Sequence, residues 1–138
     1  MGLVPRVVFD TNIWLSGLLF GGNAEKLLEL FIVGDLVVVC SEELVSELRR
    51  VVARKFPLFS PQLSLLEASI RKDAWLVQIG HQPISVCRDP DDNMILETAL
   101  VGSCSHIITG DDDLLSIGEY EGVQICKASH FLANYIRA

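Results

Sequence analysis

The chain has 138 residues, of which 50% are hydrophobic, and its formal net charge is −7 at pH 7. This length and composition suit a single domain, residues 1–138, and exclude a disordered chain. The acidic charge speaks against simple electrostatic capture of nucleic acid by a basic surface. It fits an arrangement in which several acids share one pocket and hold divalent cations.

The sequence does not indicate a membrane protein, a secreted protein or a zinc-binding protein. The apolar run over residues 13–20 is too short to span a bilayer, and Ser16 and Gly17 interrupt it. No signal peptide precedes the first predicted strand, so the expected location is the cytoplasm. The four cysteines form no Cys-x-x-Cys pair and have no histidine at zinc spacing, which argues against a structural zinc site.

The first predicted strand, residues 7–9, ends directly at Asp10, which Thr11 and Asn12 follow. The strand is expected to be buried on both faces, because a half-exposed strand would alternate apolar and polar residues. Ligands of open parallel α/β sheets bind at the carboxyl ends of the strands, so Asp10 is the first candidate for chemistry. The same three residues also suit a turn and a cap for the helix that begins near Ile13.

The next segments predict two helices and a second buried strand. A short helix over residues 13–19 ends at Gly21 and Gly22, and a second helix begins at Asn23, which caps it. The continuous apolar run over residues 36–40 predicts the strand.

Ser41 is expected to cap the helix that follows this strand. Glu47 lies at the edge of the apolar stripe of this helix. Its carboxylate can point along the carboxyl edge of the sheet, or it can pair with Arg50 or Arg54 on the solvent side. The pattern of this helix alone does not decide between the two.

The middle of the chain predicts a long helix that begins at Ser60, with Pro61 in its first turn, and ends near residue 77. Trp75 is expected to pack in the core or against another helix, because no second aromatic lies among basic residues nearby. Residues 84–86 predict a short edge strand.

The most polar segment, residues 88–93, leads into a helix over residues 91–101. Asp92 heads the buried stripe of this helix and needs a partner, because an unpaired buried carboxylate is costly. Asp89 and Asp91 are expected to cap the helix and to face solvent.

Another short strand is predicted over residues 106–109, and Asp111 and Asp113 follow it closely. These acids also suit a solvated turn or a cap for the helix from Leu114, whereas the spacing of an EF-hand calcium loop is missing. A last strand over residues 123–126 and a helix from about residue 129 complete the chain.

Strands that alternate with helices predict an α/β fold with three layers, α/β/α, around a central parallel sheet of about five strands. Right-handed crossovers place the carboxyl ends of the strands at one edge. Asp10, Glu47, Asp92 and Asp111 therefore converge on one cleft. Their mutual repulsion calls for a counter-charge, and Mg²⁺ or Mn²⁺ prefers such oxygen ligands. Two such ions, ~3.5–4 Å apart, can activate water at a phosphodiester.

Four segments of this chain, taken in order, resemble the PIN-domain family. They are residues 7–12, Ser41 with Glu47 in the following helix, residues 88–99 and residues 109–114. The likeness is closest to the small prokaryotic VapC-like toxins of toxin–antitoxin pairs. The resemblance implies a Mg²⁺- or Mn²⁺-dependent endoribonuclease that acts on RNA and is frequently a homodimer. It also implies an antitoxin protein that inserts a basic segment into the acidic cleft.

The resemblance also implies roles for individual residues. Asp10, Asp92 and Asp111 would hold the metal, and Glu47 would complete the set as a ligand or through water. Asp113 is an additional ligand candidate. Asn12 and Thr109 match polar residues that orient the ligands. Apart from the resemblance, the candidates for substrate contacts are Arg49, Arg50 and Arg54, in a basic cluster with Lys55 beyond Glu47, although such a cluster is more often a solvated helix face.

Two other functions fit parts of the pattern. A phosphatase of the haloacid-dehalogenase type also begins with a strand that ends in Asp, but it needs a second Asp where this chain has Asn12. A catalytically silent PIN-like module that binds RNA or protein would not require all four acids.

Overall fold

The computed structural model describes residues 4–81 and 84–135. Its strands pair in the order β3-β2-β1-β4-β6-β5. All neighbouring strands run parallel except β5 and β6, which form an antiparallel pair. The strands are β1 (Arg6–Phe9), β2 (Val37–Ser41), β3 (Trp75–Val77), β4 (His106–Ile108), β5 (Glu119–Tyr120) and β6 (Val123–Cys126).

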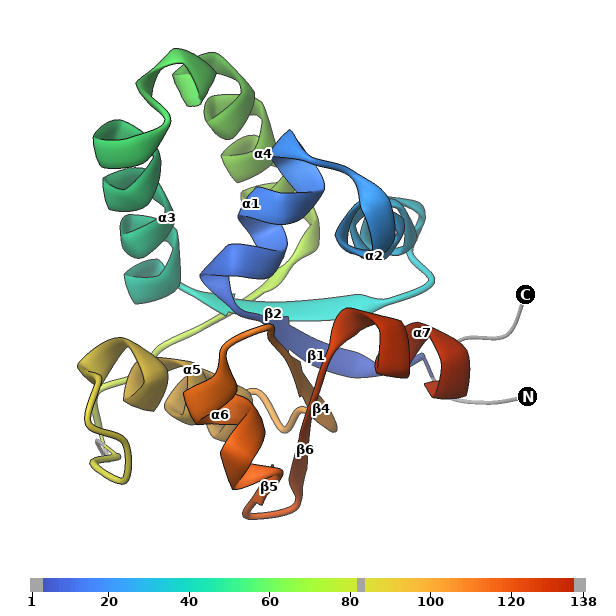
Figure 1. Ribbon diagram of the computed structural model, residues 1–138, viewed down its shortest axis with the longest axis vertical. Coiled ribbons are helices and arrows are strands. Elements are labelled where there is room, and N and C mark those ends of the chain that lie inside the picture. Colours follow the sequence, from blue (N-terminus) through green and yellow to red (C-terminus); the bar gives the residue numbers. More distant parts are fainter. Residues whose placement is uncertain (1–3, 82–83, 136–138) are drawn as a thin grey trace.

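Helices cover both faces of this sheet, so the predicted three-layer α/β/α fold is confirmed. Figure 1 shows α1 to α4 on one side and α5 with α6 on the other, while α7 packs against α2. The helices are α1 (Thr11–Leu19), α2 (Gly22–Val33), α3 (Glu42–Lys55), α4 (Ser60–Asp73), α5 (Pro90–Val101), α6 (Asp112–Ile117) and α7 (Ala128–Tyr135), with a 3-10 turn at Pro57–Phe59.

The core is centred on β1, as its apolar sequence predicts. Val7, Val8 and Phe9 are fully buried. The ring of Trp14 packs edge-on against Phe9 and Phe31, with ring centroids 4.9 Å and 5.6 Å apart. These contacts fix α1 and α2 against the sheet, and so they fix the position of the residues that follow β1.

Two predicted boundaries are wrong. The predicted cap Asn23 lies inside α2, which begins at Gly22, because Gly21 and Gly22 both adopt positive φ and form the turn themselves. The helix predicted to reach residue 77 ends at Asp73, and Trp75–Val77 forms β3 beside β2. The short apolar run suits a strand as well as a helix end, and pairing with β2 decides the matter.

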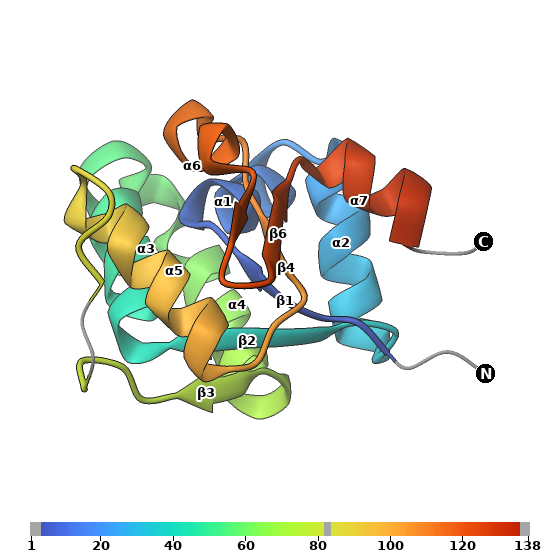
Figure 2. The same cartoon turned by 90° about the horizontal axis from the view of Figure 1, so that it is seen from below.

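The predicted positions of Trp75 and of the edge strand are wrong as well. Trp75 is 52% exposed on β3, where the guanidinium of Arg6 lies 4.2 Å from its ring centroid. Figure 2 shows β3 at the edge of the sheet, the place that residues 84–86 were expected to take. Residues 84–86 form a loop instead. Asn93 holds this loop, because its amide accepts from the Cys87 N–H and donates to the Cys87 carbonyl.

Close packing between α5 and the sheet predicts a cost for enlarging Gly102. A Cβ at this position would overlap with Cγ1 of Val39, which is fully buried in β2. We expect Gly102→Ala to lower the free energy of unfolding by about 1–3 kcal/mol, the usual cost of overpacking. Gly110→Ala is the matched control, because its Cβ would meet nothing within 4 Å. Equal urea midpoints for the two variants would contradict the prediction.

Among the described residues, none of the helices combines the length and the apolar character that crossing a membrane requires.

Candidate active site

Asp10 lies where β1 ends and is only 8% exposed. Its Oδ1 accepts from the Asn12 N–H at 3.2 Å, which caps α1. Its Oδ2 accepts from the Thr109 hydroxyl, which follows the neighbouring strand β4. The Thr109 Oγ1 also accepts from the Asp111 N–H at 2.9 Å. Asp10 therefore caps a helix and, through Thr109, is also tied to the loop that carries Asp111.

Glu47 points from α3 toward the start of α1. Its Oε1 accepts from the Thr11 hydroxyl at 2.9 Å. Its Oε2 is buried and has no hydrogen-bond partner among the described residues. Within the same part of the chain, no ion pair joins Glu47 to Arg50 or Arg54. Of the two directions that the helix pattern allows, Glu47 takes the one toward the carboxyl edge of the sheet.

A buried pair of hydroxyls fixes α3 relative to α5. The Ser41 Oγ accepts from the Leu44 N–H at 3.4 Å, which confirms the predicted cap of α3. It also lies 3.0 Å from the Thr98 Oγ1 on α5, and both side chains are fully buried. This contact holds the helix of Glu47 beside the helix of Asp92.

Three carboxylates form the tightest acidic group of the site. Asp92, Asp111 and Asp113 each offer one oxygen, and these oxygens all lie within 4.8 Å of one another. Asp92 lies in the first turn of α5, Asp111 caps α6 and Asp113 lies in the first turn of α6. Residues about 20 positions apart thus meet because α5 and α6 begin at the same edge of the sheet.

The electrostatics join Asp10 and Glu47 to this group. Burial, followed by the charge of Asp111, raises the pKa of Asp92 to about 7. Burial also raises the pKa of Asp10, despite the opposing hydrogen bond from Thr109, and the Asp111 charge adds to it. Burial raises the pKa of Glu47, with added repulsion from Asp91 and Asp10. The acids therefore resist ionising together unless positive charge is supplied.

The donor set fits a hard divalent cation. The acids offer only oxygen ligands, which Mg²⁺ and Mn²⁺ prefer. The buried Oε2 of Glu47 lacks a donor from the described residues, and such an atom is costly without a ligand. Three carboxylate oxygens are already close enough to share one ion. The residues that could hold a metal are therefore Asp92, Asp111 and Asp113, with Asp10 and Glu47 beside them.

The three arginines of α3 lie in different surroundings. Arg49 forms an ion pair with Glu67 of α4, in a cluster that Arg71 extends to Glu42. Arg50 and Asp91 line a hollow of about 430 Å³. The charge of Arg50 partly opposes the rise in the pKa of Glu47 that burial causes. Arg54 is exposed near the end of α3. Of these three arginines, Arg50 is therefore the one with an electrostatic link to a candidate ligand.

Two residues of the site were not singled out from the sequence. Asp91 is exposed to solvent as predicted, and its charge also acts on Glu47. Thr11 was considered only as part of a turn, yet it donates to Glu47. Local pattern carries no signal for either contact, because both partners come from another helix. Asp89 does cap α5 as predicted, since it accepts from the Asp91 N–H at 2.9 Å.

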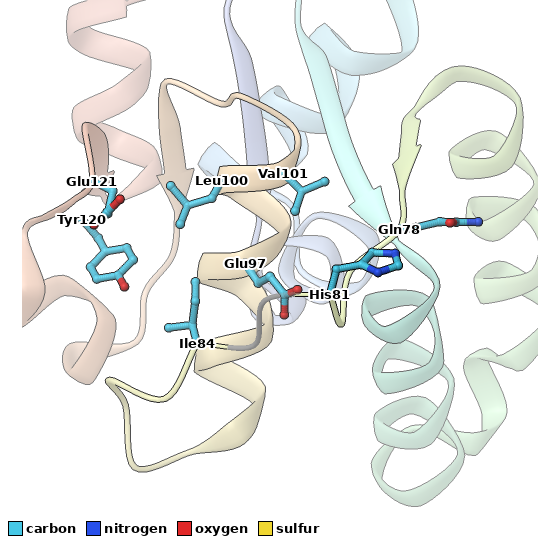
Figure 3. A pocket seen from close by; sticks show the side chains of 8 residues that line it. All are labelled: Gln78, His81, Ile84, Glu97, Leu100, Val101, Tyr120 and Glu121. Carbon is cyan, nitrogen blue, oxygen red and sulfur yellow. The ribbon is translucent and has the colours of Figure 1, made fainter.

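A second hollow lies farther along α5 and holds none of the predicted site residues. Its volume is about 350 Å³. Figure 3 shows the side chains that line it. In it, Glu97 is 7% exposed and its Oε2 accepts from the Gly80 N–H. Glu97 thereby ties the segment after β3 to α5. Its lining residues are Gln78, His81, Ile84, Glu97, Leu100, Val101, Tyr120 and Glu121.

Comparison with known families agrees with this geometry. The model of the PIN domain family matches residues 6–113, a span that contains all the clustered acids. No protein among those with curated functions matches the chain. PIN domains are generally nucleases, and a carboxylate cluster is present here. A family match over most of the chain, a parallel sheet and acids gathered at its carboxyl edge agree, and the chain belongs to the PIN domain family.

Proposed function

We propose that this protein is a metal-dependent endoribonuclease, a hydrolase that cleaves RNA phosphodiester bonds with Mg²⁺ or Mn²⁺. The observation that carries the proposal is the meeting of Asp92, Asp111 and Asp113 oxygens within 4.8 Å of one another. Asp10 and Glu47 lie in the same electrostatic surroundings. A set of acids whose pKa values are raised by burial and mutual repulsion gains most from a cation.

Each acid has a role in this proposal. Asp10, Asp92 and Asp111 hold the metal, while Glu47 and Asp113 complete the set. Bound divalent ions would activate water and stabilise the leaving oxygen of a phosphodiester.

The residues around the acids keep them in place. The hydroxyl of Thr109 and the N–H of Asn12 hold the two oxygens of Asp10, and the hydroxyl of Thr11 holds one oxygen of Glu47. The side chain of Asn12 is exposed at the rim. These contacts support the oriented set of ligands that metal-assisted hydrolysis requires.

Substrate contacts are assigned to the arginines of α3. Arg50 shares a hollow with Asp91 and acts on Glu47, so it is the first candidate to contact a phosphate, with Arg54 one turn farther along the helix. Arg49 is paired with Glu67 and would have to leave this partner to bind RNA. With a net charge of −7, the protein depends on metal ions to bring RNA phosphates to its acids.

The finer assignment follows the sequence resemblance to VapC-like proteins. We propose a toxin of a toxin–antitoxin pair, built as one domain that forms a homodimer and acts in the cytoplasm. An antitoxin with a basic segment would complement the acidic cleft. Co-purification with a basic partner protein and light scattering of the isolated chain test the two partners separately.

Cleavage of single-stranded RNA tests the central proposal. We expect purified protein to cut a labelled RNA when Mg²⁺ or Mn²⁺ is present and to stop when a chelator removes the ion, because the acids alone repel phosphate. A DNA strand of the same sequence is the comparison substrate. Activity that survives chelation would reject the mechanism. Calorimetry that detects no divalent binding would favour the silent PIN-like binding module instead.

A further inference from the structure

The contact between Thr11 and Glu47 joins two helices across the candidate site. Thr11 is the first residue of α1 and is 3% exposed. Its hydroxyl donates to Oε1 of Glu47, which lies 36 positions later in α3. Asp10, not Thr11, supplies the side-chain cap of α1. The Thr11 hydroxyl is therefore not needed to begin the helix, and its one proton goes to Glu47.

The second oxygen of Glu47, unlike the first, has no hydrogen-bond donor among the described residues. This oxygen, Oε2, is buried. Asp10 and Asp91 place further negative charge near it, while Arg50 contributes charge but no hydrogen bond that the structure records. Native proteins seldom bury a carboxylate oxygen without a partner. A cation bound among the neighbouring acids, or a water, would satisfy Oε2.

We propose that Thr11 is a positioning residue for Glu47, and that by holding Oε1 it leaves Oε2 as the oxygen that would bind a divalent ion, directly or through water. The inference rests on the proposed function. It adds Thr11 as the residue that orients the carboxylate of Glu47 for metal binding. A glutamate side chain has several rotatable bonds, and one bonded oxygen removes much of this freedom before the metal arrives. Loss of the Thr11 hydroxyl should therefore weaken metal binding.

The test compares Thr11→Val, which keeps the shape but removes the hydroxyl, with Thr11→Ser, which keeps the hydroxyl. Mn²⁺ affinity is measured by calorimetry on the purified protein, independently of any RNA. We expect Thr11→Val to weaken Mn²⁺ binding by about 10–100-fold, the range for residues that orient metal ligands. Thr11→Ser should stay within about threefold of the wild type.

Two further measurements separate positioning from general damage. Gly102→Ala, at the opposite end of α5 from Asp92, should lower thermal stability while Mn²⁺ affinity is kept. In a Glu47→Ala background, Thr11→Val should have no further effect on Mn²⁺ affinity, because the residue acts only through Glu47. The loss of RNA cleavage in Thr11→Val, relative to the wild type, should be smaller at saturating Mn²⁺ than at low Mn²⁺.

The outcomes distinguish this inference from the proposed function. If the wild type binds Mn²⁺ and Thr11→Val binds it equally well, the inference alone is overturned. The same holds if Thr11→Val weakens binding as much in the Glu47→Ala background as in the wild type. If the wild type binds no Mn²⁺ and cuts no RNA, the proposed function fails, and the inference fails with it.

Discussion

Asp10→Asn is expected to lower the rate of RNA cleavage by more than about 100-fold without unfolding the protein. Mutation of a residue that merely orients a metal ligand lowers metal affinity or activity by about 10–100-fold. Mutation of Asp10, a proposed ligand that also accepts from Thr109, should lower activity further. The substitution keeps the size of the side chain and an oxygen that can accept from the Asn12 N–H. It removes the negative charge that the cation requires. Single-turnover cleavage of a labelled RNA measures the loss.

The fold of this variant should persist, because burial already disfavours the charged form of Asp10 and raises its pKa. We expect the thermal midpoint of metal-free Asp10→Asn to equal or exceed that of the wild type, while Mn²⁺ no longer raises it as far. Asp35→Asn is the matched control, since Asp35 is exposed in the turn between α2 and β2. Full activity in Asp10→Asn, or an equal loss in Asp35→Asn, would refute the assignment of Asp10.

The second large effect is on stability as a function of pH. Asp92 has a pKa of about 7 in the folded protein, against a usual value of 3.8. Between these values the folded state binds the proton more tightly than the unfolded state does, so this residue costs stability increasingly as the pH rises from about 4 to 7. Removing the charge should therefore stabilise the metal-free protein most above pH 7.

We expect metal-free Asp92→Asn to be more stable than the wild type by roughly 1–2 kcal/mol at pH 8, a figure reduced for screening by solvent. The gain should shrink at pH 5 and vanish below pH 4. Urea unfolding of both proteins at each pH measures the difference. Burial lowers the pKa of His106, so its contribution to stability rises with pH, opposite to that of Asp92. Because both proteins contain His106, this contribution cancels in the comparison.

Metal ions should reverse the order of stability of the wild type and Asp92→Asn. At pH 8, Mn²⁺ supplies the positive charge that the acids lack, so it should stabilise the wild type more than Asp92→Asn. A concentration of 100 times the dissociation constant adds about 2.7 kcal/mol to a protein that binds one ion. A metal-free wild type that is more stable than Asp92→Asn at pH 8 would show that the acids are not crowded as the structure indicates.

Much of the fold follows from local pattern. The buried runs of β1 and β2 are predicted because strands covered on both faces are continuously apolar, and β4 and β6 are predicted as further short strands. The order of strands and helices then implies a parallel sheet, and a carboxylate after a strand must lie at its carboxyl edge. Asp10 and Asp111 are predicted in this way, whereas Asp92 is predicted from its place at the head of the apolar stripe of its helix.

The sequence by itself thus determined the four central strands, most of the helices and which acids lie at one edge of the sheet. Only the tertiary structure decided that Trp75 joins the sheet, that Glu47 turns toward Thr11 and that Arg49 pairs with Glu67. Periodicity records how deeply each element is buried, but it does not record which neighbour an edge residue meets. That choice depends on strand order and on the angle at which each helix packs, and both arise only when distant parts of the chain come together.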